Sequence, residues 1–314
     1  MPKSAYGRIL NDNIHVSKFL KNALLLDTDP DFNTDEKIDL IIQRIASAEM
    51  HISSTTGCDT LRHAEHRRSS CSEDSDRRRL RRQIFQELTQ NKHLDRDDDI
   101  ELGVGGALPS GTLSKDKKAF LVIGLPASGK SEVANILSDK YGAIILDSDY
   151  AKRKLPEYNS DYGTYIVHDE SCLIVFGGNA DFSGEESVLE YAIKNNLNIV
   201  IPRIGDKKEK ICELAKWLKS NGYKNHLILV RLDREKATIR ALKRFNNSGR
   251  YVSLPMIFDV YGNDPTIVFY DLQMEHCEYF SDYSMISSDV SIGEPKKILC
   301  STSEEIVNIY ERSV

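Results

Sequence analysis

The chain has 314 residues, of which 40% are hydrophobic and 29% charged, as in soluble globular proteins of one large or two ordinary domains. A formal net charge of −6 argues against a dedicated nucleic-acid-binding protein. Six cysteines occur without C-x-x-C pairing, which favours reduced thiols over a disulfide framework or a zinc site. The N-terminus lacks the apolar core of a signal peptide, and no apolar run approaches 18 residues. We therefore expect a protein that folds in a cytoplasm, its own or that of a host into which it is secreted.

The first 117 residues are expected to form two regions. Residues 1–52 carry isoleucine, leucine and phenylalanine at helical spacing and predict two helices. Residues 53–117 predict a polar, partly disordered linker with one short helix over 84–94, ending in a loop rich in Gly, Pro and Ser. The arginine-rich run around residues 77–82 is interpreted as a solvated linker or helix face, the alternative being a site for nucleic acid or an acidic partner.

Residues 119–131 are the strongest functional signal. Residues 120–123 are a continuous apolar run, typical of a strand buried on both faces, and residues 132–139 are compatible with a helix. Between them, Gly124, Gly129, Lys130 and Ser131 match the phosphate-loop pattern G-x-x-x-x-G-K-[ST]. In this pattern backbone N–H groups surround phosphates, the lysine reaches the terminal phosphates and the hydroxyl holds Mg²⁺. The predicted ATP-binding residues are Gly124, Leu125, Pro126, Ala127, Ser128, Gly129, Lys130, Ser131 and Glu132, with Ser131 as the Mg²⁺ ligand.

Acidic residues follow the next predicted strand. Residues 143–146 form this apolar strand, which ends at Asp147-Ser148-Asp149. Parallel α/β sheets bind ligands at the carboxyl ends of their strands, so one carboxylate can face Mg²⁺ and the other an acceptor hydroxyl. Helix capping is the alternative for Asp147. The basic residues beginning at Lys152 can hold an acidic acceptor or lie on a solvated face.

The remaining chain alternates helices and strands. Helices are predicted over 165–176, 183–195 and 207–221, strands over 197–201, 226–232 and 283–287, and a closing helix over 303–312. This alternation predicts a P-loop kinase-type doubly wound parallel sheet with flanking helices over residues 118–314, preceded by the small helical, partly disordered region.

Three arginines lie in a predicted lid. Asp233 caps a helix that carries Arg240 and Arg244 one turn apart, and Arg250 lies in the polar loop that follows. Loop arginines beside a triphosphate site commonly neutralise the charge that develops on a transferred phosphoryl group, although each could be an ordinary solvent arginine.

In motif order, residues 118–300 resemble the zeta toxin family of P-loop kinases. The resemblance is carried by the phosphate loop, the segment DSDYAKRKLPEY, the segment NIVIPRIGDKKEK and the segment IRALKRFNNSGRY. Zeta toxins phosphorylate a hydroxyl of a UDP-linked amino sugar from ATP, and a related effector branch phosphorylates NAD. The resemblance implies that Asp149 is the general base, that Lys130 and Ser131 bind phosphate and Mg²⁺, and that Arg240 or Arg244 acts with Arg250 in the lid.

The acceptor side departs from the family pattern. Well-known members have Glu-Gly-Thr after the third strand, where this chain has Pro202-Arg203-Ile204. The family's sugar contacts from that tripeptide therefore do not carry over. We expect Asp149, Lys152 and Arg203 to contact the acceptor, together with Glu170 from the segment 168–171, for which a helix cap is an equal explanation.

The predicted protein is thus an ATP- and Mg²⁺-dependent kinase acting on a hydroxyl of a nucleotide-type small metabolite, as a toxin or effector. Two alternatives stay open: a polynucleotide 5′-kinase, and a catalytically impaired NTP-binding interaction module. The N-terminal residues are interpreted as a fused antitoxin-like inhibitor, a segment for secretion or for an antitoxin or other partner protein, or merely additional helices.

Overall fold

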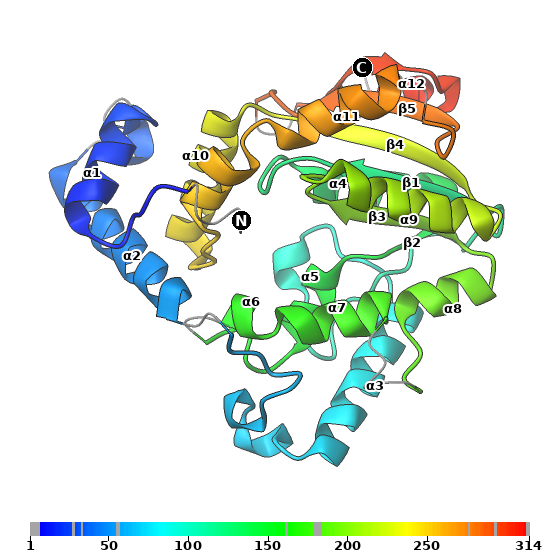
Figure 1. Ribbon diagram of the computed structural model, residues 1–314, viewed down its shortest axis with the longest axis horizontal. Coiled ribbons are helices and arrows are strands. Elements are labelled where there is room, and N and C mark those ends of the chain that lie inside the picture. Colours follow the sequence, from blue (N-terminus) through cyan, green and yellow to red (C-terminus); the bar gives the residue numbers. More distant parts are fainter. Residues whose placement is uncertain are drawn as a thin grey trace.

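A six-stranded, mainly parallel sheet forms the centre of the computed structural model, which describes residues 7–26, 29–32, 34–54, 57–160, 163–178, 184–275, 277–291 and 294–311 (Figure 1). The strand order is β2-β3-β1-β4-β5-β6. The strands are β1 (Lys118–Ile123), β2 (Ala143–Ile145), β3 (Asn198–Arg203), β4 (Lys224–Arg231), β5 (Asp282–Ser287) and β6 (Lys297–Ser301). β1 to β5 are parallel and β6 is antiparallel to β5. The predicted P-loop kinase-type α/β sheet is confirmed, with β6 as an additional edge strand.

The helices flank this sheet. They are α1 (Asn13–Asn22), α2 (Asp35–Ser54), α3 (Asp74–Gln90), α4 (Lys130–Tyr141), α5 (Ser148–Lys154), α6 (Gly163–Ile166), α7 (His168–Phe176), α8 (Val188–Lys194), α9 (Lys208–Ser220), α10 (Arg234–Ser248), α11 (Asp264–Met274) and α12 (Glu304–Glu311), with a π-helical segment over Met256–Tyr261. The predicted helix over 183–195 begins later, at Val188, and Ser183 itself lies outside the described residues. No helix among the described residues is long and apolar enough to cross a membrane.

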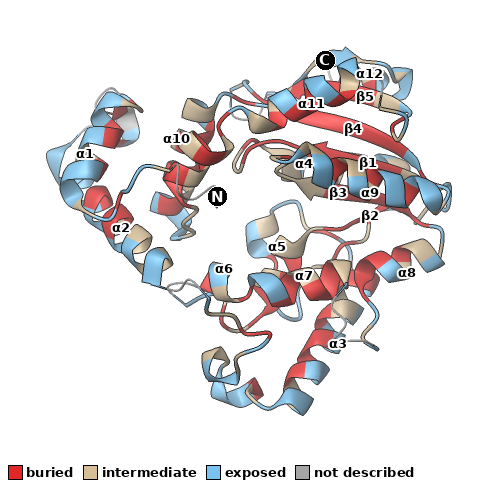
Figure 2. Ribbon diagram, viewed as in Figure 1, coloured by how far each residue is buried: buried red, intermediate tan, exposed pale blue. Residues whose placement is uncertain are grey.

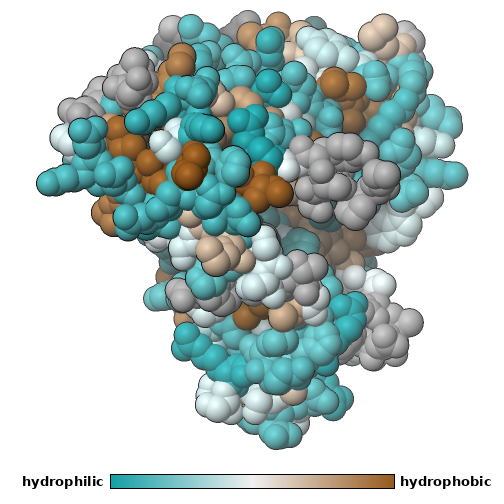
Figure 3. All heavy atoms as spheres, turned by 60° about the vertical axis from the view of Figure 1, so that its left-hand side comes forward, coloured by the Kyte–Doolittle hydropathy of each residue, from teal (hydrophilic) through white to brown (hydrophobic). Residues whose placement is uncertain are grey.

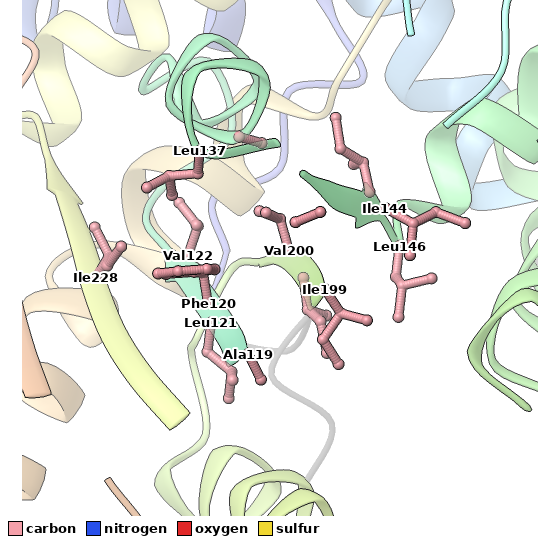
Figure 4. Close-up of a cluster of buried hydrophobic side chains, with 14 of the residues drawn as sticks. Ala119, Phe120, Leu121, Val122, Leu137, Ile144, Leu146, Ile199, Val200 and Ile228 are labelled. Atoms are coloured by element: carbon pink, nitrogen blue, oxygen red, sulfur yellow. The ribbon is translucent and has the colours of Figure 1, made fainter. Parts of the chain in front are cut away.

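Strand burial explains why the central sequences are almost entirely apolar. β1 lies between β3 and β4, so both of its edges are hydrogen-bonded, and its residues from Ala119 to Ile123 are buried on both faces of the sheet. Figure 4 shows Phe120 and Val122 of β1 packed with Leu137 of α4, Val200 of β3 and Ile228 of β4. Buried residues run through the strands and the inward faces of the helices in Figure 2. This packing fixes the phosphate loop, which connects β1 to α4.

The N-terminal helices pack on the lid helix α10 and form a second hydrophobic core. Figure 1 shows α1 and α2 beside α10, and the shared core includes Phe19, Ile45, Leu242 and Phe258. Arg8 donates to both carboxylate oxygens of Asp259, with Nε–Oδ2 and Nη2–Oδ1 distances of 2.7 Å. The outward surface of this region is mostly hydrophilic with separate hydrophobic patches (Figure 3). The predicted pair of N-terminal helices is therefore present and is packed against α10 and the segment that follows it.

The expectation of a solvated or disordered segment up to Arg82 was wrong. α3 spans 17 residues, and its residues Leu80, Ile84 and Leu88 belong to the main core. Arg77 is completely buried and Arg81 is nearly so. Arg77 pairs with Glu170 and Arg81 with Glu185, and these carboxylates compensate the cost of removing the arginine charges from water. Sequence periodicity identified only the last turns of this helix because arginines occupy part of its buried face.

Candidate active site

A cleft of about 1480 Å³ opens at the carboxyl edge of the sheet. Its lining comprises the phosphate loop after β1, residues 147–149 after β2, residues 202–207 after β3, and the lid from α10 to Tyr261. Because these strands are parallel, their carboxyl ends meet at one edge. The fold thus brings together most of the residues that the sequence analysis assigned to donor and acceptor.

The phosphate loop has the backbone geometry of an anion-binding nest. Gly129 and Ala127 have positive φ values of 86° and 60°, which turn successive peptide groups toward one side. A Cβ on Gly124 would lie 2.6 Å from the carbonyl oxygen of Val230, so only glycine fits there. Lys130 Nζ donates to the carbonyl oxygens of Gly124 and Leu125 at 2.8 and 2.7 Å, and burial lowers its pKa to about 8.

Two aspartates follow β2 in different environments. Asp147 caps α5 by accepting from the Asp149 backbone N–H at 2.9 Å. Burial and the charge of Asp149 raise the pKa of Asp147 to about 6. Although burial disfavours its charge, the cations Lys152, Arg250 and Arg153 hold the pKa of Asp149 well below the usual range. Asp149 therefore carries the permanent negative charge of this edge, and the capping role considered for Asp147 is present.

The lid arginines converge on the same place. Arg250 Nη2 donates to Asp149 Oδ2 at 2.7 Å, and its Nη1 donates to Asp98 Oδ1 at 3.1 Å. Arg244 lines the cleft beside it, where burial and the charge of Arg250 lower the Arg244 pKa to about 10. Arg240 also lines the cleft and donates to the Ser288 carbonyl oxygen at 2.8 Å. All three predicted lid arginines thus face the cleft that contains Lys130.

The family of this chain is shown by its match to a family model. The family model described as Zeta toxin matches residues 109–267, which is just over half of the chain. The chain belongs to the zeta toxin family. It is accordingly a phosphotransferase of the ATP-using toxin-kinase class. No curated protein matches the chain significantly.

Solved structures similar to this zeta toxin family member have low sequence identity. One, from work on the PezAT chromosomal toxin-antitoxin system of Streptococcus pneumoniae, is 15% identical, covering 76% of this chain and 87% of the other at a TM-score of 0.49. The AvrRxo1-ORF1:-ORF2 complex is 17% identical, covering 76% and 72% at 0.47. The same complex with ATP is 17% identical, covering 75% and 68% at 0.42.

Two of the remaining predicted residues, Lys152 and Arg203, line the cleft. Lys152 Nζ lies 2.9 Å from Asp149 Oδ1, and Arg203 lies with its guanidinium carbon 3.9 Å from the centre of the Phe176 ring. Both line the cleft, together with Lys207. Arg203 therefore brings a cation into the cleft after β3.

Glu170 does not line the cleft, so the expectation that it contacts the acceptor was wrong. Its side chain is completely buried, and its oxygens accept from Arg77, Arg81 and Thr60. The carboxylate points toward α3 and the segment before it. His168 and Asp169, which immediately precede it on α7, line the cleft instead. A helix places adjacent residues about 100° apart, so the acidic cluster at 168–171 could not identify which member faces the cleft.

Two segments that line the cleft were not predicted from the sequence. The first is the acidic loop before β1, in which Asp98 contacts Arg250 and also accepts from Arg153 Nη2 at 3.2 Å. The second is the segment 57–63, of which Gly57, Cys58, Asp59, Arg62 and His63 line the cleft. The only signal for the first was the run of acidic residues DRDDDIE, and the second carried none.

The site residues fit Mg·ATP. Ser128 Oγ is buried without a hydrogen-bond partner among the described residues, as expected of a group placed for a phosphate oxygen. Ser131, in the first turn of α4, and Asp147 both line the cleft. A hydroxyl and a carboxylate are the oxygen ligands that Mg²⁺ takes beside nucleotide phosphates. Apart from these, the described residues hold no group of three or more His, Cys, Asp or Glu side chains arranged for a metal ion.

Proposed function

We propose that the protein transfers the γ-phosphoryl group of Mg·ATP to a hydroxyl of a nucleotide-type small metabolite. The expected acceptors are a sugar nucleotide resembling UDP-N-acetylglucosamine, or NAD, and the physiological role is that of a toxin or effector. The observation that carries the proposal is the arrangement of Asp149, Lys130 and Arg250 in one cleft, with Arg250 bonded directly to Asp149. A strand-end carboxylate beside a phosphate loop and a lid arginine is what phosphoryl transfer to a hydroxyl requires.

Each group has a defined task in this proposal. Asp149, ionised at neutral pH, orients the acceptor hydroxyl and receives its proton. Lys130 and the phosphate-loop N–H groups hold the β- and γ-phosphates, while Arg244 and Arg250 neutralise the charge that develops on the transferred group. Ser131 and Asp147 would hold Mg²⁺, which supplies electrostatic stabilisation of the phosphate oxygens when bound.

The charge of the acceptor end supports an acceptor that carries phosphate. Lys152, Arg203, Lys207 and Lys210 line this part of the cleft, and Arg62 enters it from the N-terminal segment. A diphosphate linkage, as in UDP-sugars and NAD, offers oxygens to such cations. A polynucleotide would also present phosphates, so oligonucleotides belong in the test.

The proposal is tested by incubating purified protein with ATP, Mg²⁺ and a panel of UDP-sugars, NAD and 5′-hydroxyl oligonucleotides, and reading acceptor masses. We expect phosphorylation of one nucleotide-type metabolite, which Lys130→Ala and Asp149→Asn each reduce by several powers of ten. Lys140→Ala, an exposed lysine on the same helix α4, is the matched control and should leave the rate unchanged. Transfer to oligonucleotides would select the polynucleotide kinase.

ATP binding without any phosphorylated product would instead favour the impaired interaction module. The proposal also includes an inhibitory antitoxin or other partner protein, because a toxin kinase must be restrained in the cell that makes it. Capture of a protein encoded beside this chain that suppresses its ATP turnover would support this part of the proposal.

A further inference from the structure

The two ends of the connection between β5 and β6 lie next to the phosphate loop, because the atoms nearest to a Cβ built on Gly129 belong to Ser288 and Lys296. β1, β4 and β5 are parallel neighbours, so the chain leaves β5 at the edge where the phosphate loop begins. Ser288, the first residue after β5, donates its N–H to the Arg231 carbonyl oxygen at 3.1 Å and accepts from Arg240 at 2.8 Å. These bonds attach the start of the β5–β6 connection to the end of β4 and to the lid helix α10.

Lys296, at the far end of this connection, reaches the phosphate loop. Its side chain is only 5% exposed, and its ammonium group pairs with the carboxylate of Glu132 in the first turn of α4. A Cβ built on Gly129 would lie 3.1 Å from Lys296 Cε and 3.7 Å from Nζ. A lysine from the carboxyl-terminal part of the chain therefore lies against the glycine that precedes Lys130.

Lys130 and Lys296 approach the loop from different directions. Lys130 is bonded to carbonyl oxygens at the beginning of the loop, whereas Lys296 is paired at its end, beyond Ser131. In phosphate loops the motif lysine reaches the β- and γ-phosphates, whereas the backbone N–H groups of the loop surround the α- and β-phosphates. The position of Lys296 thus corresponds to the α-phosphate end of a bound nucleotide.

The carboxylate that holds Lys296 is suited to release it. The Glu132 side chain is 63% exposed, so it loses little when it rotates into solvent. The buried ammonium group then requires another anion, because an unpaired buried charge is costly. A nucleotide phosphate in the loop supplies that anion at a helix N-terminus, where negative charge is already favoured.

The geometry points to Lys296 as a further nucleotide-binding residue, whose ammonium group exchanges Glu132 for the α-phosphate of the donor. This inference rests on the proposed binding of ATP at the phosphate loop. Lys296 lies outside residues 109–267, the part of the chain that the family model matches. A purely structural ion pair, which attaches the β5–β6 connection to α4, is the competing explanation.

Titration calorimetry with ATP and with ADP, on the full chain and in the presence of Mg²⁺, distinguishes the two explanations. Lys296→Met keeps the aliphatic stem against Gly129 and removes the charge; we expect it to weaken both nucleotides about tenfold, equally because both carry the α-phosphate. Lys296→Arg should restore most of the affinity. Glu132→Gln should tighten binding, because it frees the lysine and removes a negative charge near the phosphates. Lys297→Met, at the exposed neighbouring residue, is the matched control.

Two results would overturn the role of Lys296 in nucleotide binding, and a third its assignment to the α-phosphate. One is affinity of Lys296→Met within twofold of the unmodified chain. The other is equal weakening by Lys296→Met and Glu132→Gln, which identifies the pair as structural. Loss for ATP without loss for ADP would overturn the assignment to the α-phosphate. If the unmodified chain binds no ATP, the proposed donor site itself fails, and that outcome is separate from all of these.

Discussion

Removing the buried charge of Arg77 should destabilise the protein strongly. Its Nε and Nη2 donate to Glu170 at 2.8 and 2.6 Å, and its Nη1 and Nη2 donate to Glu157 at 2.9 and 3.0 Å. In Arg77→Ala, Glu170 keeps Arg81 and Thr60 as partners, whereas Glu157 keeps, among the described residues, the backbone N–H of Arg68. Losing one partner of a buried ion pair costs about 3–5 kcal/mol. Because both glutamates keep other hydrogen-bond donors, we expect a loss at the lower end of this range, about 3 kcal/mol.

Urea unfolding at pH 7.5 measures this loss as a change in the free energy of unfolding. Arg79→Ala is the matched control, because this side chain on the same helix is 80% exposed and should change stability by less than about 0.5 kcal/mol. Adding Glu157→Gln to Arg77→Ala should recover part of the loss, since it removes the orphaned charge. A loss below about 1 kcal/mol for Arg77→Ala, or no recovery in the double variant, would refute the reasoning.

Three further predictions concern the cleft and the N-terminal residues. The pKa of Asp147 is raised from 3.8 to about 6, so its ionisation lowers the stability of the folded protein progressively above pH 3.8 and to the full extent above pH 6. Asp147→Asn, which still caps α5, should therefore stabilise the nucleotide-free protein by about 3 kcal/mol at pH 7.5 and by less at pH 5, measured by urea unfolding. Arg250→Ala should lower kcat for ATP turnover about 100-fold and Arg250→Lys by less, in steady-state assays; equal loss in both would point to collapse of the lid. A chain starting at Leu113 should show a lower melting temperature and lower activity, because it lacks α3 and the helices that cover α10; higher activity would instead support a fused inhibitor.

The sheet and the phosphate loop were predictable because their signals are local. Strands covered on both faces read as continuous apolar runs, and the loop between β1 and α4 has a fixed pattern of glycines, lysine and serine. Asp149 was predictable for a related reason: a parallel strand ends directly before it, and such ends share one edge of the sheet. These inferences needed no knowledge of distant contacts.

The errors arose where distant contacts decide the structure. Arg77 reads as a solvent residue because a buried arginine is rare, and its compensation by Glu157 and Glu170 is about 80–90 residues away in sequence. The same pairing removes Glu170 from the acceptor site. A short run of charged residues does not indicate which of its members will pair with a buried partner. Local patterns therefore led to wrong predictions for both Arg77 and Glu170.

The origin of the cleft walls explains why the acceptor is harder to identify than the donor. The donor end is built from the phosphate loop and the lid, both inside residues 109–267 that the zeta toxin model matches. The acceptor end also uses residues 57–63, outside that range, where Thr60 anchors the segment by donating to the Ile166 carbonyl oxygen and to Glu170. Arg62 from this segment pairs with Asp169 of α7 at 2.9 Å. The proposed donor residues therefore lie within the family match, whereas the part of the cleft proposed for the acceptor also draws on residues outside it.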